Sequence, residues 1–140
     1  MAISYFFEDI PSLKFKKNQL KSWLRTIAEK ECKSIQNLNY IFCSDEYILK
    51  INKQYLNHNY FTDIITFDYS IKSQISGDIF ISIDTVKTNS KKFNTRFIEE
   101  FYRVTFHGLL HTIGYNDKSK SDKEIMQAKE NEYLNYFKIQ

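Results

Sequence analysis

A long apolar segment near the carboxyl end of the chain sets the first limit on its fold. Residues 95–113 have helical periodicity that is amphipathic at first, and from Val104 onward apolar side chains occur nearly all round the helix. A helix of that kind is usually buried at the centre of a protein. Gly114 follows directly, at the position where glycine commonly ends a helix. The segment therefore predicts a central helix on which the other elements pack.

The rest of the chain contains few residues that interrupt regular structure, since it has one proline and three glycines. This scarcity favours long helices and strands over a turn-rich β-sandwich. Side-chain periodicity predicts an α/β or α+β domain with a sheet of about four strands. In chain order we expect a strand over 2–7, a helix over 15–31, a strand over 38–43, a helix over 45–56, two strands within 63–83 that Gly77 separates, a helix from Ser82 to about Phe93, the central helix, and a helix over 122–137.

Serine residues mark three of the predicted helix starts. Ser44 precedes an acidic pair whose charges favour the amino end of a helix dipole. Ser82 precedes another helical segment and can cap it in the same way. Ser121, with Glu124 three residues later, forms a capping-box signature at the start of the last helix.

The composition is that of one soluble domain over residues 1–140. The apolar fraction is 42% and the charged fraction 26%, so we expect a single folded core and no long disordered region. No segment approaches the length of a membrane span, and the first residues do not form a signal peptide. Cys32 and Cys43 are too few for a disulfide framework, so we expect reduced thiols, with Cys43 buried. These features favour a cytoplasmic location.

Two of the three histidines lie four residues apart in the predicted central helix. His107 and His111 then share one face, one turn apart, so both imidazoles can reach the same ion. Gly114 lets the chain turn back, and Asp117 can then supply a third ligand. The pattern H-x3-H-x2-G-x2-D has the spacing of the metzincin zinc motif, with Asp in place of the last His.

Three protein ligands with a fourth position open to water indicate a catalytic zinc site. Zinc lowers the pKa of its bound water to roughly 7, which makes hydroxide available at neutral pH. Two imidazoles and one carboxylate also suit nickel, iron or manganese, so another divalent metal is an alternative to zinc. The motif therefore predicts a catalytic metal site with one ion per chain.

Both parts of this pattern also have structural explanations. A histidine in an apolar helix can be a core residue whose polar atoms are satisfied within the protein. A Gly-Tyr-Asn-Asp turn can form for conformational reasons alone, without Asp117 acting as a ligand. We favour metal binding because two of only three histidines lie at ligand spacing directly before a helix-ending glycine.

The residue after His107 narrows the reaction class. In H-E-x-x-H peptidases this position holds the glutamate that acts as general base, and here it is Gly108. Glu100 lies seven residues before His107 on the same helical stripe and is our candidate catalytic base or supporting partner. The alternative for Glu100 is a surface carboxylate near the start of the helix.

Residues 107–117, HGLLHTIGYND, resemble the signature H-G-x-L-H-x-x-G-Y-D-H of the bacterial YbeY family of rRNA maturation factors, described as metal-dependent endoribonucleases. Residues 62–67 and 77–79 are similar to the family segments T-D-V-L-S-F and G-D-I, and the resemblance covers roughly residues 38–135. It implies a single-layer mixed sheet of about four strands, with about five helices around a zinc-binding cleft. We expect four further matching residues to be scaffold. They are Thr62, Asp63, Gly77 and Asp78.

The chain departs from the family pattern at two positions. The third family ligand is histidine, and here it is Asp117, which is also a competent zinc ligand. The family arginine that follows an aromatic residue corresponds to Leu56, which can neither grip a phosphate nor stabilise its charge. Lys53, His58 and Lys118 are candidate RNA-binding residues, although each has the alternative of an ordinary solvated side chain.

A mildly basic net charge of +3 is compatible with a polyanionic partner, and it also describes an ordinary lysine-rich surface. Beyond Lys118, the candidates for a basic rim are Lys87, Lys91, Lys92, Arg96 and Lys120.

Three functions are compatible with these residues. The favoured one is a zinc-dependent endoribonuclease in rRNA maturation and ribosome assembly, in which metal-activated water hydrolyses RNA phosphodiester bonds. Its partner would be rRNA or the small ribosomal subunit. The second is a ribosome-assembly or RNA-binding factor that keeps its metal for structure and cleaves weakly or not at all, which Leu56 favours. The third is a small zinc metallopeptidase, which Gly108 opposes.

Overall fold

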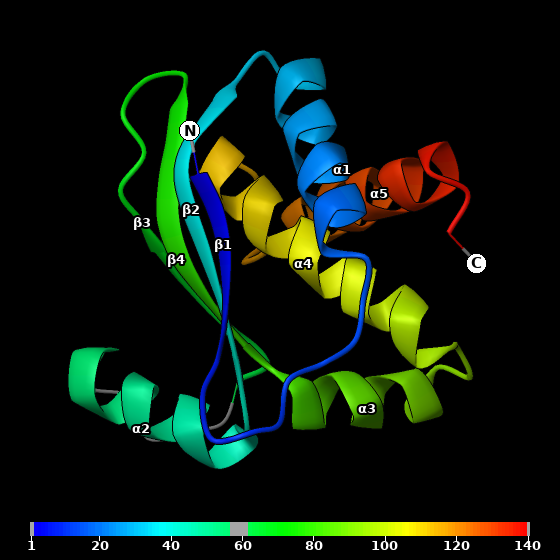
Figure 1. The fold of residues 1–140 in the computed structure, drawn as a ribbon. Coiled ribbons are helices and arrows are strands. Elements are labelled where there is room, and N and C mark those ends of the chain that lie inside the picture. Colours follow the sequence, from blue (N-terminus) through cyan, green and yellow to red (C-terminus); the bar gives the residue numbers. More distant parts are fainter. Residues whose placement is uncertain (1, 57–61, 140) are drawn as a thin grey trace.

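The computed structural model describes residues 2–56 and 62–139, so the candidate RNA contact His58 lies outside the described residues. Strands and helices alternate over the first part of the chain, and two consecutive strands and then three helices follow (Figure 1). In order they are β1 (Ala2–Phe7), α1 (Lys17–Lys30), β2 (Ser34–Cys43), α2 (Asp45–Leu56), β3 (Ile64–Asp68), β4 (Gln74–Ser82), α3 (Ile83–Lys92), α4 (Phe97–Ile113) and α5 (Lys120–Tyr136).

The four strands form one mixed sheet in the order β1-β2-β4-β3. Both β1 and β4 run parallel to β2, whereas β3 runs antiparallel to β4 at the edge of the sheet. Parallel neighbours require a crossover connection, and α1 supplies it between β1 and β2. This open sheet, with five helices in the described residues, confirms the predicted fold class.

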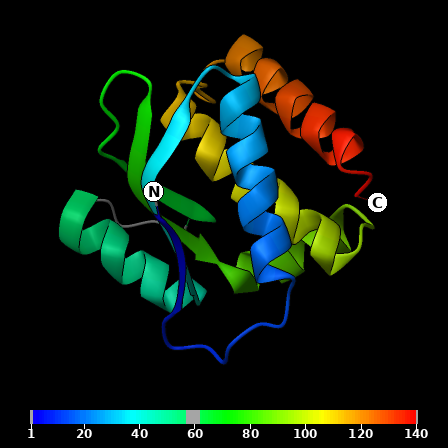
Figure 2. The ribbon, with the colours of Figure 1, turned by 45° about the horizontal axis from the view of Figure 1, so that its top comes forward.

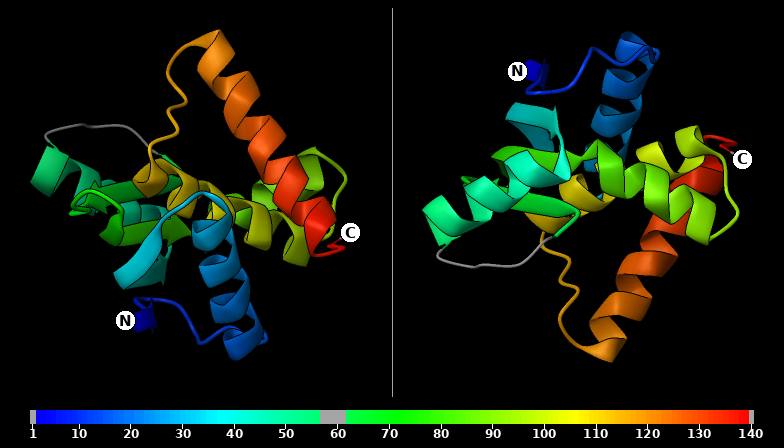
Figure 3. Two further views of the ribbon diagram at one scale, coloured as in Figure 1. Left: turned by 90° about the horizontal axis from the view of Figure 1, so that it is seen from above. Right: turned by 90° about the horizontal axis from the view of Figure 1, so that it is seen from below.

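The helix α4 lies at the centre of the fold, as its apolar composition predicts. It packs against β3 and β4 on one side and against α1, α3 and α5 on the others (Figure 2). Figure 3 shows α1 and α5 on opposite sides of α4. Large apolar side chains of α4 are almost completely buried, among them Phe101, Phe106, Leu109 and Leu110.

Gly108 lets α4 approach the sheet closely. A Cβ atom at this position would lie 2.8 Å from Ile79 Cγ2 and 3.2 Å from Ile64 Cδ1. Protein interiors are close-packed, so a larger side chain here must displace the side chains of Ile79 and Ile64 or the strands that carry them. The position at which H-E-x-x-H peptidases carry their general base is therefore a packing position in this chain, which argues against the metallopeptidase alternative.

The other face of the sheet is covered in part by α2. Ile48 and Ile51 of α2 pack with Ile65 of β3 and with Cys43. Successive residues of a strand point to opposite faces, so Ile64 contacts α4 while Ile65 contacts α2. Cys43 is buried, as predicted.

Two predicted strand boundaries are wrong. β2 begins at Ser34 and not at residue 38, because its first residues pair with the start of β4. The break between β3 and β4 lies over residues 69–73, and Gly77 is inside β4. A Cβ atom at Gly77 would lie 2.7 Å from the carbonyl oxygen of Phe67, so this glycine serves the close approach of two strands and not a turn.

One predicted helix start is also wrong. The side chain that caps α5 belongs to Ser119, whose Oγ accepts a hydrogen bond from the backbone N–H of Asp122 at 3.0 Å. Ser121 lies inside the helix. The starts at Ser44 and Ser82 are confirmed, since each Oγ accepts a backbone N–H from the first turn of its helix. Among the described residues, none of the helices combines the length and the apolar character needed to cross a bilayer.

Candidate metal centre

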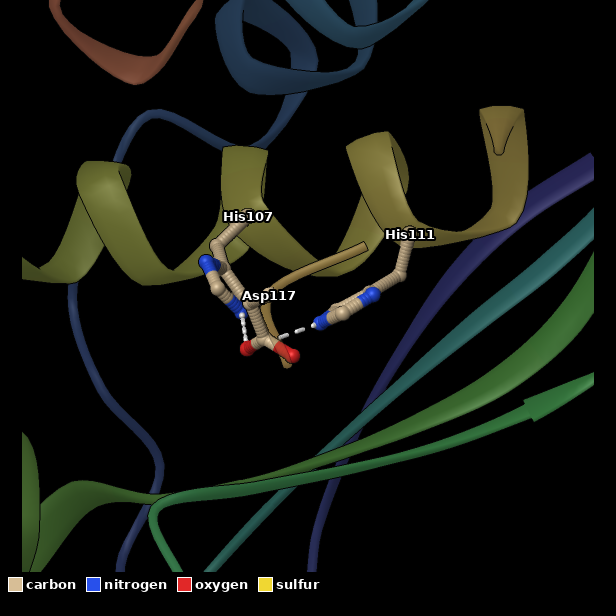
Figure 4. A group of neighbouring side chains, drawn as sticks. All are labelled: His107, His111 and Asp117. Atoms are coloured by element: carbon tan, nitrogen blue, oxygen red, sulfur yellow. Dashed lines mark ion pairs between the residues drawn. The ribbon is translucent and has the colours of Figure 1, made fainter. Parts of the chain in front are cut away.

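The structure brings the three predicted metal ligands together at the end of α4 (Figure 4). His107 and His111 lie on one face of the helix, with ring centroids 4.6 Å apart. Gly114 ends the helix at a φ of 126°, in the region that favours glycine. The chain then turns back, and Asp117 Oδ2 lies 3.3 Å from Nε2 of each histidine.

These donor atoms fit a single divalent ion. One ligand atom from each of the three residues lies within 4.8 Å of the other two. Two imidazole nitrogens and a carboxylate oxygen form a donor set that zinc accepts, as do other divalent transition metals. The imidazoles are mostly buried, with 18% and 23% of their side chains exposed, whereas Asp117 is 39% exposed. The group is therefore open to solvent mainly on the side of the aspartate.

Glu130 of α5 is a member of the site that the sequence interpretation missed. Its Oε2 lies 2.6 Å from Nδ1 of His107, and its Oε1 accepts a hydrogen bond from Nη1 of Arg103 at 3.0 Å. Sequence does contain a signal for it, because Glu130 lies on the apolar stripe of α5 with Met126 and Tyr133. A carboxylate on a core-facing stripe requires a buried partner.

The two histidines have pKa values that move in opposite directions from the ordinary value. For His107 burial acts to lower the pKa, but the hydrogen bond and charge of Glu130, together with Asp117, outweigh it and raise the pKa. For His111 burial and the neighbouring His107 lower the pKa. His111 is therefore the more readily neutral of the two, and neutral imidazole is the form that binds a metal.

A partly buried cluster around Glu31 holds the connection that carries Asp117. Glu31 directly follows α1, and its Oε1 accepts a hydrogen bond from the Tyr115 hydroxyl at 2.5 Å. Its Oε2 accepts hydrogen bonds from the Tyr133 hydroxyl and, at 3.1 Å, from Lys129 Nζ. Burial acts to raise the pKa of Glu31, but these hydrogen bonds outweigh it and hold the pKa below its ordinary value. The cluster ties the connection after α4 to both α1 and α5.

Open cavities adjoin the three predicted ligands on both sides. The His107 cavity has a volume of about 470 Å³ and is lined mainly by α4 and α5. The His111 cavity has a volume of about 390 Å³ and extends along β3. Asp117 lines both cavities, so the predicted ligands lie where the two meet.

Glu100, the candidate catalytic residue, is 6% exposed and lines the His107 cavity. The alternative of a surface carboxylate is therefore wrong. A smaller cavity of about 90 Å³ is lined by Glu100 and His107 together with Asp63, Arg103 and Glu130. Burial raises the pKa of Glu100, and the charge of Arg103 opposes that rise.

Of the predicted RNA-binding residues, the two that the structure describes, Lys53 and Lys118, lie outside these cavity linings. Lys53 is exposed in the last turn of α2, and Lys118 is exposed directly after Asp117. The cationic residues that line the His107 cavity are Arg103 and Lys123, neither of which the sequence interpretation named. The other rim candidates are exposed. They are Lys87, Lys91, Lys92, Arg96 and Lys120.

Of the four residues predicted to be scaffold, Thr62 and Asp63 line the His111 cavity. Asp78 accepts a hydrogen bond from Nδ2 of Asn39 at 2.9 Å and so links β4 to β2. Asp63 and Asp78 therefore differ in surroundings, since the first lines a cavity beside the predicted ligands and the second joins two strands.

Comparison with known proteins extends over nearly the whole chain. The family model described as Endoribonuclease YbeY matches residues 7–138. Endoribonuclease YbeY of Parabacteroides distasonis is 50% identical over 134 residues, which cover 96% of this chain and 94% of that protein. The protein of the same name from Cytophaga hutchinsonii is 50% identical over 138 residues, covering 98% of this chain and 96% of the relative.

A solved structure shares the fold. The solution structure of a protein from Thermotoga maritima matches with a TM-score of 0.66 and 27% sequence identity, covering 98% of this chain and 92% of the other. The family match over residues 7–138 includes α4 and the connection that carries Asp117. The chain belongs to the family described as Endoribonuclease YbeY.

Proposed function

We propose that this chain is a zinc-dependent endoribonuclease that acts in rRNA maturation and ribosome assembly, with the rRNA of the small ribosomal subunit as its partner. The observation that carries the proposal is the convergence of His107, His111 and Asp117 beside two open cavities. Relatives that are 50% identical over almost the whole chain bear the name endoribonuclease, which supports RNA as the substrate.

We assign metal binding to Nε2 of His107, Nε2 of His111 and the carboxylate of Asp117. A bound zinc ion supplies a Lewis acid and lowers the pKa of water at the site. Glu100 is our candidate to accept a proton from the attacking water. Its carboxyl lines the same cavity as His107, and burial raises its pKa toward the neutral range, in which a general base is most effective.

The charges of the two cavities suggest how an RNA strand lies across the site. Lys123 and Arg103 line the His107 cavity, although Arg103 is already bonded to Glu130. Asp63 and Asp68 line the His111 cavity, where their charges repel a phosphate. The His107 cavity also contains the carboxylates of Glu100 and Glu130, but it is the one of the two whose described lining includes cationic side chains, so we place the phosphate there and a sugar or a base on the His111 side. We retain Lys53, His58 and Lys118 as proposed contacts to the RNA backbone.

One observation favours a second candidate, a ribosome-assembly factor that binds RNA and keeps its metal for structure. Leu56, at the end of α2, is 39% exposed and apolar at the position where the resemblance implies an arginine. A leucine offers no hydrogen bond to a phosphate. On this alternative, removing the metal weakens folding or RNA binding, and no turnover is lost.

The test is cleavage of structured rRNA fragments by purified protein, with and without a chelator. An identically purified His107→Ala variant controls for contaminating ribonucleases. We expect wild-type cleavage that chelator abolishes and zinc restores, and no cleavage by the variant. Glu100→Gln should keep its zinc and lose about 100-fold or more in rate if Glu100 is the base. Equal cleavage by wild type and His107→Ala, or none by either while wild type holds its metal, favours the assembly-factor alternative.

A further inference from the structure

We propose that Glu130 is a positioning residue of the metal centre, which fixes the ring of His107 so that Nε2 faces the ion. The inference rests on the metal binding assigned under the proposed function, and it does not depend on whether RNA is cleaved. It adds a residue from α5 to a site whose predicted ligands all come from α4 and the connection that follows it.

The first support is the hydrogen bond between the two side chains. Nδ1 of His107 lies 2.6 Å from Oε2 of Glu130, while Nε2 of the same ring lies 3.3 Å from Oδ2 of Asp117. An ionised carboxylate only accepts hydrogen bonds, so Nδ1 must carry the proton in this contact. In the neutral ring that leaves the lone pair on Nε2, where a metal is bound.

The second support is the burial of Glu130, which is 7% exposed in the interior-facing stripe of α5. A buried carboxylate is costly unless both of its oxygens are paired. Here Oε2 contacts His107, and Oε1 accepts from Nη1 of Arg103 at 3.0 Å. Nη2 of Arg103 in turn donates to Oδ1 of Asn131 at 2.7 Å. The orientation of His107 is thus fixed by a chain of hydrogen bonds that ends on α5.

The two histidines differ in this respect. The surroundings of His111 include the backbone of Tyr115, a group that no side-chain substitution removes directly. His107 depends on the side chain of Glu130. Replacing Glu130 should therefore disturb one ligand of the centre and leave the other in place.

The experiment measures zinc affinity by competition with a chromophoric chelator, on wild type, Glu130→Gln and Glu130→Ala. Outer partners of metal-bound histidines typically contribute about 10- to 100-fold to metal affinity. We expect Glu130→Ala to weaken zinc binding by about that factor, and Glu130→Gln by less, because the amide oxygen can still accept from Nδ1. Both variants should still bind one zinc ion per chain at saturation.

Two matched controls separate positioning from a general loss of negative charge. Glu132→Gln removes a carboxylate that is half exposed on the same helix. Glu100→Gln removes a buried carboxylate that lines the same cavity as His107. Positioning predicts that both controls keep the zinc affinity close to wild type. A loss of zinc affinity in Glu100→Gln as large as that in Glu130→Ala would overturn it in favour of a charge effect.

A second readout distinguishes positioning from loss of folding. In the metal-free protein, at a pH high enough to keep the His107 ring neutral, nitrogen NMR should show the proton on Nδ1 in wild type and a mixture of the two tautomers in Glu130→Ala. Circular dichroism checks that both variants remain folded. Unchanged ring protonation, or zinc binding by folded Glu130→Ala within about threefold of wild type, would overturn the inference.

The outcomes also separate this inference from the proposed function. A wild-type protein that binds no divalent ion overturns both. A wild-type protein that binds zinc and cuts no RNA overturns the ribonuclease proposal alone, since the affinity series still tests Glu130.

Discussion

The two predicted ligands in α4 and the third, in the connection after α4, lie close together, but different contacts hold them in place. His107 and His111 belong to α4, which is enclosed by the sheet and three other helices, and their side chains are 18% and 23% exposed. Asp117 lies beyond the helix, and its side chain is 39% exposed. Its connection depends on the hydrogen bond between Tyr115 and Glu31, residues 84 positions apart.

This difference separates two kinds of preorganisation. The spacing of the histidines follows from the helix itself, and Gly108 seats that helix against the sheet. The place of Asp117 follows from a polar cluster that α1 and α5 complete. Changes to α4 should therefore affect the whole fold, whereas changes to the Glu31 cluster should affect mainly the third ligand.

The largest effect is expected from removing a histidine. His107→Ala and His111→Ala should both lose stoichiometric zinc, because each leaves only two of the three ligands. His107→Ala should also destabilise the metal-free protein by about 1–3 kcal/mol more than His111→Ala, since it removes a partner of the buried carboxylate of Glu130. Metal analysis and urea unfolding measure the two effects. Equal stabilities would show that the bond to Glu130 contributes little.

Gly108→Ala tests directly how closely α4 packs against the sheet. The added methyl group would overlap Ile79 Cγ2, 2.8 Å away, and overpacking of this kind typically costs about 1–3 kcal/mol. The control is a double-mutant cycle with Ile79→Ala, a substitution that makes room for the methyl group. Urea unfolding should show a smaller cost of Gly108→Ala in that background. A cost that is the same in both backgrounds would contradict the packing explanation.

Glu31→Gln tests the cluster that holds the connection. It removes the charged acceptor of two tyrosine hydroxyls and of Lys129, so we expect a loss of about 1–2 kcal/mol in the free energy of unfolding. Zinc affinity should fall by less than in His107→Ala, because both histidines stay in place. Glu29→Gln, an exposed glutamate of α1, is the matched control and should change neither quantity.

The contribution of Glu31 should also depend on pH. Its pKa in the folded protein lies below the ordinary value of 4.5. A lowered folded pKa means that the contribution is complete above 4.5 and is lost as the pH falls through the folded value. Wild type should therefore lose stability below pH 4.5 more steeply than Glu31→Gln, as measured by urea unfolding at several pH values. If the free energy of unfolding fell equally with pH in wild type and Glu31→Gln, the lowered pKa assigned to Glu31 would be contradicted.

The smallest effect is expected from Asp117→His, which installs the ligand that the family resemblance implies. Imidazole and carboxylate are both competent zinc ligands, so zinc binding should persist. Manganese prefers oxygen ligands, so its affinity relative to zinc should fall. Competition between the two ions measures the ratio of the manganese affinity to the zinc affinity. A ratio that does not change would show that Asp117 is not a ligand.

The local parts of this structure could be predicted from the sequence. The period of the helix brings His107 and His111 onto one face, and Gly114 marks where the chain turns back. Apolar side chains nearly all round α4 predict that this helix lies at the centre of the fold. The order of elements predicts a sheet with helices packed on it. The inferences about α4 use neighbours within a few turns of chain, and the one about the sheet uses only the order of the elements.

Other features were decided by the tertiary structure. Gly77 is a residue type common in turns, but strand pairing places it inside β4. Ser121 is a residue type common at helix caps, but Ser119 caps α5 and Ser121 lies inside the helix. Glu130 reaches His107 across 23 positions, and Glu31 reaches Tyr115 across 84. Local spacing follows from covalent geometry and hydrogen-bond period, so a sequence determines it. Contacts at long separation depend on how whole elements pack, and that is settled only when the chain buries its core.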